Sequence, residues 1–390
     1  MAVSERSPLN RHELLQARKR EKLRRERHRK MLIRRIIILS VPVLLIAVIL
    51  VVVITSAVSC SRKRNEKAVE ATTKITENTD SVRPHPEEAH IRKPSEPEYP
   101  YANRNKIVDG MIQVGDTKFI AGYTAEKSSS FIYPPEEISQ STYSILIDAG
   151  TGSIIAGQNE KDRMYPASMT KVMTLLVAAE HIRNLDDTVY VSQEAADYSY
   201  SQGGSAVNWS VGEKVTVKDL LYGTILSSGA DACYDLAMYV SGSLDDFVDL
   251  MNAKAVELGI SGSTHFTNCV GFYNDDHYTT VYDMAMIMKA AAENDLCREV
   301  MSAHTYTTPL TEEHPEGILI SNWFLRRIED KETKGEVLCA KTGFVNESGN
   351  CAVSYMISDS GVPYLCCTGH AHSAWRAIYD HVGLYYNYTH

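Results

Sequence analysis

An apolar stretch without a single charged side chain, residues 36–58, divides this chain into two unequal parts. At about 1.5 Å of rise per residue, a helix of this length spans about 34 Å, which is enough to cross the hydrocarbon core of a bilayer. Pro42 lies within the stretch, and proline is tolerated in membrane helices. We therefore expect a transmembrane helix at residues 36–58.

The segment before this stretch, residues 1–35, is strongly basic, with 13 Lys and Arg against 4 Asp and Glu. Lys and Arg accumulate on the cytoplasmic side of membrane helices, so the N-terminus is predicted to be cytoplasmic and the remainder extracytoplasmic. Membrane lipid is a predicted partner of the basic segment, and nucleic acid is not. An uncleaved signal anchor is favoured over a cleaved signal peptide and over lipoprotein processing at Cys60.

Residues 59–138 are interpreted as an extracytoplasmic stalk, because they are rich in Glu, Lys, Thr, Ser and Pro. A segment of this composition cannot bury enough apolar surface to fold alone. Within it, residues 106–123 carry Ile, Val and Phe around a Gly-Asp turn, which favours a small hairpin. The globular domain is then expected over residues 139–390.

Strand patterns lie at both ends of the expected domain, and helical patterns lie between them. Strands are expected at residues 142–148, 153–157, 335–340, 351–359 and 364–369. Helices are expected at residues 217–222, 230–241, 244–258, 282–293 and 372–386. This order favours one α+β domain whose sheet joins the two ends of the sequence.

The eight cysteines show no Cys-x-x-Cys spacing, and a structural zinc site is not expected. Cysteines in strand-like apolar runs are small buried hydrophobes in one interpretation. In an exported domain they can also form disulfides, and the sequence leaves both interpretations open.

Ser168 and Lys171 stand three residues apart at the start of a helical segment that continues from Val172 to Glu180. This spacing places their side chains on one helix face. Serine becomes a nucleophile when a neighbouring base takes its proton, and lysine can be that base where burial or a second cation lowers its pKa. The pair is a candidate catalytic centre.

Two further short motifs follow in order: Ser228-Gly229-Ala230 and Lys341-Thr342-Gly343. The second motif, on a strand, offers a cation and a hydroxyl for a substrate carboxylate, and a glycine that allows close approach. The three motifs together, on a helix, a loop and a strand, are a far stronger signal than any one of them.

With its surrounding segments, this set resembles the serine D-alanyl-D-alanine carboxypeptidases, the low-molecular-mass penicillin-binding proteins, over residues 139–386. The resemblance implies a β-lactamase/transpeptidase-like fold, with a five-stranded antiparallel sheet flanked by helices and a mostly helical subdomain. It also implies a peptidoglycan stem peptide ending in D-Ala-D-Ala as substrate and β-lactam antibiotics as covalent inhibitors. Neither a cofactor nor a metal is expected.

The resemblance assigns the catalytic roles. Ser168 is the expected acyl-ester nucleophile, Lys171 its proton acceptor, and Ser228 the relay that returns a proton to the leaving amine. The cation of Lys341 is expected to help keep Lys171 neutral.

The resemblance also assigns the substrate contacts. Lys341 and Thr342 are expected to hold the terminal carboxylate and Gly343 to let the substrate approach. The backbone N–H of Phe344 is the expected oxyanion donor. Ala230 stands where the family usually has Asn, so the amide that contacts the lysine and the substrate carbonyl is missing.

Two alternatives accompany this hypothesis. A class A-type β-lactamase shares the three motifs, but a Glu-x-x-Leu-Asn segment for water activation does not occur between Ala230 and Lys341. A catalytically weak wall-binding or sensory protein on the same fold is the other, and Ala230 is the residue that favours it. His277 is interpreted as structural, and Asn208 and Trp209 are candidate cleft residues.

Overall fold

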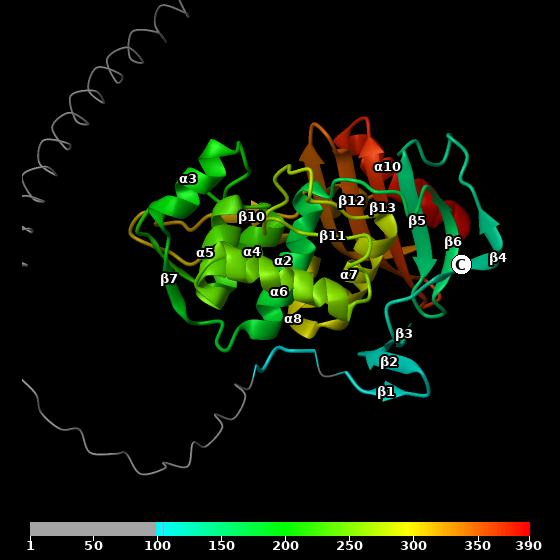
Figure 1. Ribbon diagram of the computed structural model, residues 1–390, viewed down its shortest axis with the longest axis horizontal. Helices are drawn as coiled ribbons and strands as arrows, with labels where there is room; N and C mark the ends of the chain where they lie inside the picture. Colours follow the sequence, from blue (N-terminus) through cyan, green and yellow to red (C-terminus); the bar gives the residue numbers. More distant parts are fainter. Residues whose placement is uncertain (1–98, 104) are drawn as a thin grey trace, which may run out of the picture. The chain divides into compact units, whose positions relative to one another are not determined.

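The structure is a computed structural model that describes residues 99–103 and 105–390 (Figure 1). The expected basic arm, the transmembrane stretch and the first part of the stalk lie outside the described residues. Among the helices within these ranges, none is both long enough and apolar enough to cross a membrane.

A six-stranded sheet with the order β11-β12-β13-β5-β6-β4 forms the centre of the domain. Its strands are β4 (Glu126–Ile132), β5 (Tyr143–Asp148), β6 (Ser153–Gln158), β11 (Gly335–Val345), β12 (Gly349–Ser358) and β13 (Pro363–Ala371). The antiparallel pairing of β13 with β5 joins the two ends of the domain, which confirms the α+β topology. Five strands are antiparallel as expected, but β4 adds a sixth, parallel to β6.

Helices cover both faces of the sheet because alternate strand residues point to opposite sides. Leu146 and Cys366 lie in one hydrophobic cluster with α10 (Ala374–Tyr388) and α9 (Leu325–Ile328). Their neighbours Ile145 and Cys367 lie in a second cluster with helices of the other face. These helices are α2 (Thr170–His181), α7 (Val281–Glu293) and α8 (Asp295–Ser302).

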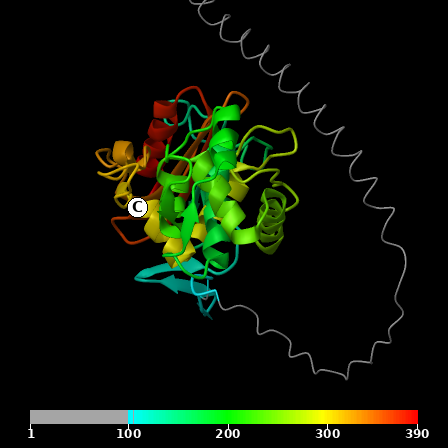
Figure 2. The ribbon, with the colours of Figure 1, turned by 90° about the vertical axis from the view of Figure 1, so that its left-hand side faces the viewer.

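The helical part lies beside the sheet and faces the viewer in Figure 2. It contains α3 (Gln193–Ser201), α4 (Val217–Leu226), α5 (Ala230–Ser241) and α6 (Leu244–Glu257), with the short strands β7 (Thr188–Tyr190) and β8 (Lys214–Thr216). A reciprocal capping box between Thr216 and Asp219 starts α4, and Gly242 ends α5 at a φ of 82°. Helix α2 packs against α4, α5 and α7, and so it connects the helical part with the sheet.

The expected domain boundary at Ser139 lies inside the folded part of the chain. The predicted hairpin at residues 106–123 is confirmed as a three-stranded sheet of β1 (Ile107–Val108), β2 (Met111–Val114) and β3 (Thr117–Ile120). The Phe119 ring is buried 5.7 Å from the ring of Tyr355. The average composition of residues 59–138 is polar, and it therefore gives no indication that Phe119 packs into the core.

A smaller difference concerns the length of β11, whereas the cysteines agree with one of the two interpretations left open by the sequence. β11 extends to Val345, so the Lys341-Thr342-Gly343 motif lies within the strand and not at its end. The remaining short elements are β9 (Thr305–Thr307), β10 (Leu319–Ser321) and the 3-10 turn η1 (Ala167–Met169). All seven cysteines in the described ranges are buried and free, which agrees with the first of the two interpretations.

Candidate active site

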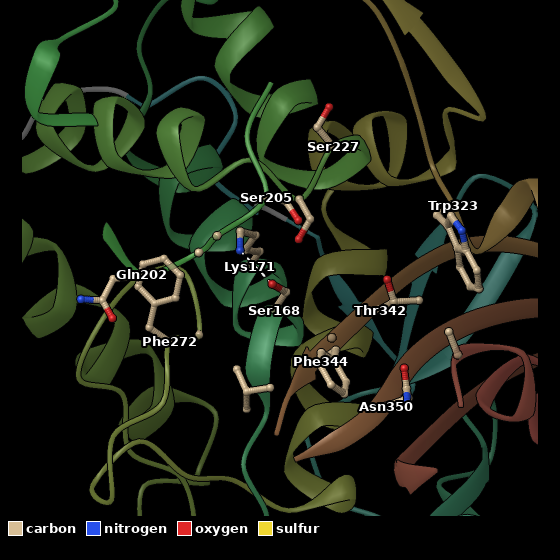
Figure 3. A pocket seen from close by; sticks show the side chains of 17 residues that line it. Ser168, Lys171, Gln202, Ser205, Ser227, Phe272, Trp323, Thr342, Phe344 and Asn350 are labelled. Atoms are coloured by element: carbon tan, nitrogen blue, oxygen red, sulfur yellow. Dashed lines mark hydrogen bonds between the residues drawn. The ribbon is translucent and has the colours of Figure 1, made fainter. Parts of the chain in front are cut away.

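A cleft of about 460 Å³ lies between the start of α2, the loops of the helical part and the open edge of β11 (Figure 3). In the sheet order, β11 is the terminal strand, so one side of its backbone is free to meet a ligand. The cleft is lined by Ser168, Lys171, Gln202, Gly203, Gly204, Ser205, Ser227, Ser228, Gly271, Phe272, Trp323, Thr342, Gly343, Phe344, Val345, Asn350 and Ala374.

Ser168 and Lys171 form the first pair in this cleft. The Lys171 Nζ lies 3.0 Å from Ser168 Oγ and donates a second bond of 2.8 Å to the carbonyl oxygen of Val270. Lys171 is only 2% exposed, and burial lowers the pKa of its amine. A buried amine with a lowered pKa can be neutral and accept the proton of the serine.

The backbone before Ser168 is unusual. Ala167 has a φ of 46°, a left-handed conformation that is uncommon for alanine, and it turns the chain sharply into η1 and α2. Gly343 of β11 packs directly against this turn: a Cβ at Gly343 would lie 2.9 Å from both Ser168 N and Pro166 O. Gly343 of the Lys341-Thr342-Gly343 motif therefore allows β11 to lie against the turn that leads into α2.

Ser228 and Lys341 form a second pair. The Lys341 Nζ donates bonds of 2.9 Å to Ser228 Oγ and 2.8 Å to Thr342 O. Burial, and second the positive charge of Lys171, lower the pKa of Lys341 to about 7. Lys341 is 3% exposed and does not line the cleft, whereas Ser228 and Thr342 do. Its charge therefore acts from behind these two hydroxyls.

Two backbone N–H groups lie at this edge of the cleft. The Val345 N–H donates to Ser348 Oγ in the turn to β12, and consecutive residues of a strand direct their N–H groups to opposite edges. The N–H of Phe344 thus points to the open edge of β11. The N–H of Ser168 belongs to the first turn of a helix, where N–H groups have no partner within the helix. This arrangement is the one expected of an oxyanion site.

Ala230 begins α5 and is fully buried. Its N–H donates to the Ser205 carbonyl at 2.7 Å, and its methyl group lies 3.1 Å from where a Cβ at Gly204 would be. The loop of Gly203 and Gly204 therefore lies directly against the residue that replaces the expected Asn. The neighbouring Asp231 carboxylate accepts the N–H groups of Val207 and Asn208 and fixes this loop to α5.

His277 lies beside the start of α2 and does not line the cleft. The Thr267 N–H donates to Nδ1 at 3.0 Å, so the proton is on Nε2, which bonds Thr170 Oγ1 at 2.8 Å. Burial lowers the pKa of His277 to about 3, and the ring is therefore neutral. These contacts agree with the structural interpretation of this histidine.

Some residues of the cleft were not found from the sequence, and two candidates lie elsewhere. Phe272 and Trp323 line opposite parts of the cleft (Figure 3). The Arg327 guanidinium lies over the Trp323 ring, 4.1 Å from its centroid. In the sequence, Phe272 and Trp323 are each only an aromatic side chain beside a loop, and this pattern does not indicate a position in a cleft. The candidates Trp209 and Asn208 do not line the cleft, and the Trp209 ring is buried against Gly223.

Metal ligation and charge can also be compared with the structure. Within the ranges that the structure describes, no three His, Cys, Asp or Glu side chains gather as metal ligands would. The cleft instead presents hydroxyls, amines and backbone N–H groups. An α+β domain with a serine and a buried lysine of lowered pKa at a helix start, beside an open sheet edge, has the architecture of proteins that transfer acyl groups through serine.

Comparison with known proteins identifies the family. Residues 124–362 match the family model described as D-alanyl-D-alanine carboxypeptidase, peptidase S11. The match covers more than half of the chain, and the chain belongs to this family.

Curated relatives align over a shorter region. The D-alanyl-D-alanine carboxypeptidase DacF of Bacillus subtilis (strain 168) is 40% identical over 149 residues, which are 37% of this chain and 37% of the relative. The D-alanyl-D-alanine carboxypeptidase of Streptomyces sp. (strain K15) is 36% identical over 165 residues, which are 40% of this chain and 56% of the relative. The chain thus spans between about a third and somewhat over half of the length of these relatives.

Solved structures confirm the fold. The crystal structure of the Streptomyces K15 DD-transpeptidase is similar with a TM-score of 0.59 and 26% identity, covering 66% of this chain and 98% of that chain. The D-alanyl-D-alanine carboxypeptidase of Mycobacterium tuberculosis H37Rv shares the fold with a TM-score of 0.57 at 24% identity, over 67% of this chain and 94% of that one. The expected β-lactamase/transpeptidase-like fold is therefore present, with β4 as an additional strand.

Proposed function

We propose that this protein is a membrane-anchored serine D-Ala-D-Ala carboxypeptidase. It removes the terminal D-alanine from peptidoglycan stem pentapeptides through a seryl acyl-enzyme, and β-lactams inhibit it by acylating the same serine. The observation that carries the proposal is a cleft at the edge of β11 lined by two serines, Ser168 and Ser228, each hydrogen-bonded to a buried lysine. The membrane anchor in this proposal rests on the uncharged stretch at residues 36–58.

Acylation begins with the first pair. Neutral Lys171 accepts the hydroxyl proton of Ser168, and Oγ forms a bond to the carbonyl carbon between the two D-alanines. The carbonyl oxygen becomes an oxyanion, for which the N–H groups of Ser168 and Phe344 are the proposed donors. One such donor typically contributes about 3–4 kcal/mol to the transition state.

The second pair acts on the leaving group. When the C–N bond breaks, the leaving nitrogen takes a proton from Ser228, and the proton removed from Ser168 replaces it. The Lys341 ammonium donates to Ser228 Oγ and so orients that hydroxyl. A water then attacks the seryl ester, Lys171 takes its proton, and Ser168 recovers its hydroxyl. The two half-reactions restore the starting enzyme.

The substrate carboxylate is recognised by hydroxyls with a cation behind them. Thr342 and Ser228 line the cleft and can donate to the carboxylate, while buried Lys341 supplies the positive charge. Gly343 lets β11 lie against the turn that carries Ser168, and so a substrate backbone along the strand edge comes close to that serine. A terminal carboxylate one residue beyond the scissile bond fits this arrangement.

Intact-mass analysis of the full chain with benzylpenicillin tests the proposal. The expected result is one adduct of the mass of the antibiotic, located at Ser168 and lost in Ser168→Ala. A Ser168→Ala variant that still forms the covalent adduct would overturn the assignment of the nucleophile.

Ala230 favours a second candidate, a catalytically weak wall-binding protein on the same fold. Its methyl group can make none of the hydrogen bonds of the usual amide, and the loop of Gly204 lies against it. Release of D-alanine from a pentapeptide ending in D-Ala-D-Ala separates the two: binding to cell wall without release supports the second. Rapid turnover of penicillin would instead support a β-lactamase.

A further inference from the structure

The amine of Lys171 is oriented by a backbone carbonyl. A neutral amine has two N–H donors and one lone pair, and it can take the serine proton only when the lone pair points at Ser168 Oγ. The bond of 2.8 Å from Lys171 Nζ to Val270 O fixes the rotation of the amine. Because Ala230 has no side-chain acceptor, the amine of Lys171 is oriented by the Val270 carbonyl instead.

The position of the Val270 carbonyl depends on one side chain. Asn268 Oδ1 accepts the N–H groups of Val270, Gly271 and Phe272 at 3.2, 2.7 and 3.0 Å, and Asn268 Nδ2 donates to the Phe272 carbonyl at 3.0 Å. A single amide therefore holds three successive peptide N–H groups on one side of the loop.

With these N–H groups held, the loop carbonyls face α2. The carbonyl of Cys269 accepts the hydroxyl of Thr174 at 2.5 Å, and the carbonyl of Val270 accepts the amine of Lys171, one helical turn earlier. Loop and helix are thus joined by two bonds along one face of α2. Both acceptors are backbone atoms, so their place is set by the fold of the loop.

The loop also packs too closely against the nucleophile turn to shift without consequence. A Cβ at Gly271 would lie 1.8 Å from the carbonyl oxygen of Ala167, and Gly271 has a φ of 87°. Ala167 immediately precedes Ser168. A displacement of this loop therefore alters both members of the first pair.

We propose that Asn268 is a positioning residue for catalysis: through the Val270 carbonyl, it orients the amine of Lys171 toward Ser168. The inference rests on the proposed function and deepens it. Asn268 acts through the loop and does not line the cleft.

A merely structural fastener is the alternative, and the chain offers a matched control. Asn252 on α6 accepts the N–H of Phe266 and donates to the carbonyl of Phe266, both at 2.9 Å. It ties the start of the same segment to the domain but has no bond to the peptides at residues 270–272. Asn252→Ala therefore removes a comparable fastener and leaves the acceptor of Lys171 in place.

The experiment measures acylation of the detergent-solubilised full chain by a fluorescent penicillin, separating the dissociation constant from the first-order acylation rate constant. Asn268→Ala should lower the rate constant by about 10²-fold, since a misplacement of about 1 Å costs this much, and leave the dissociation constant within about threefold. Asn268→Asp retains the acceptor oxygen and should recover most of the rate. Asn268→Ser, too short to hold three N–H groups, should lie between Asp and Ala.

The outcomes separate the inference from the function on which it rests. A wild-type chain that forms no adduct overturns the proposed function. A wild-type chain that acylates, with Asn268→Ala at an equal rate, overturns only the positioning role. The positioning role is also overturned if the acylation rate constants of Asn252→Ala and Asn268→Ala both fall, each in proportion to the decrease in melting temperature of that variant. If Asn268→Ala fails to fold, the acylation rate constants of the wild type, Asn268→Asp and Asn268→Ser test the positioning role instead. Equal rate constants in all three would overturn it.

Discussion

Two serine–lysine pairs of nearly equal length lie at the cleft, and they differ in what surrounds them. In the first pair, Lys171 and Ser168 lie 3.0 Å apart on one helix, and a distant loop provides the second acceptor. In the second, Lys341 and Ser228 lie 2.9 Å apart but 113 residues apart in sequence, and β11 itself provides the second acceptor. The same two side chains are thus placed by local spacing in one case and by tertiary structure in the other.

The two serine–lysine pairs are not interchangeable. Ser168 lies at the start of α2 near the N–H of Phe344, which points to the open edge of β11, whereas Ser228, with a φ of 56°, lies in the loop between α4 and α5. Lys171 reaches the cleft, and Lys341 remains behind its serine. The first pair is therefore suited to attack, and the second to holding charge and passing protons.

Removing the base of the first pair should have the largest effect. Lys171→Ala leaves Ser168 without a proton acceptor, and general base catalysis typically contributes about 10²–10⁴-fold. The acylation rate constant with a fluorescent penicillin should fall by that factor. Equal acylation in Lys171→Ala and the wild type would remove the distinction between the pairs.

Removing the serine of the second pair should cost less. Ser228→Ala leaves the nucleophile and its base intact, so the loss should lie at the lower end of the range for proton transfer, about 10²-fold in kcat/KM for D-alanine release. The acylation rate constant of Ser228→Ala with a fluorescent penicillin is measured as well, so that its loss can be compared directly with that of Lys171→Ala. A loss larger than that of Lys171→Ala would reverse the two roles.

Much of the first pair could be predicted from the sequence, because a helix fixes the three-residue spacing of Ser168 and Lys171. The approach of Ser228 to Lys341 was predictable only through the resemblance. The Val270 carbonyl could not be foreseen, since every residue has a carbonyl and only the fold selects one.

The fold was predicted with a similar limit. The strands 143–148 and 363–371 have apolar β-rich sequences and were located from them. β4 has the sequence EKSSSFI, which carries too few apolar residues to stand out from a polar stalk. Its place in the sheet depends on parallel pairing with β6, a contact that local sequence does not encode.

The pH dependence should sharpen the contrast between the two lysines. Because the pKa of Lys341 is lowered to about 7, its positive charge is present below that pH and lost above it. The kcat/KM for a peptide with a terminal carboxylate should fall toward tenfold per pH unit on the alkaline side of this value. Lys341→Arg keeps the charge, and its profile should stay level there. An alkaline limb unchanged in Lys341→Arg would assign it to another group.

The smallest expected effect concerns the support of the first pair by His277, whose ring bonds Thr170 next to Lys171. Its pKa is lowered to about 3 in the folded chain, whereas the unfolded chain takes up the proton near the ordinary value of 6.5. Folding stability should therefore decrease as the pH falls from about 6.5 toward 3, by about 2 kcal/mol at pH 5 from this group. In His277→Gln, this part of the pH dependence should disappear from urea unfolding curves, and substitution of the exposed His372 should leave it in place. An unchanged slope in His277→Gln would mean that the ring is already protonated in the folded chain, and that the first pair lies beside a second positive charge.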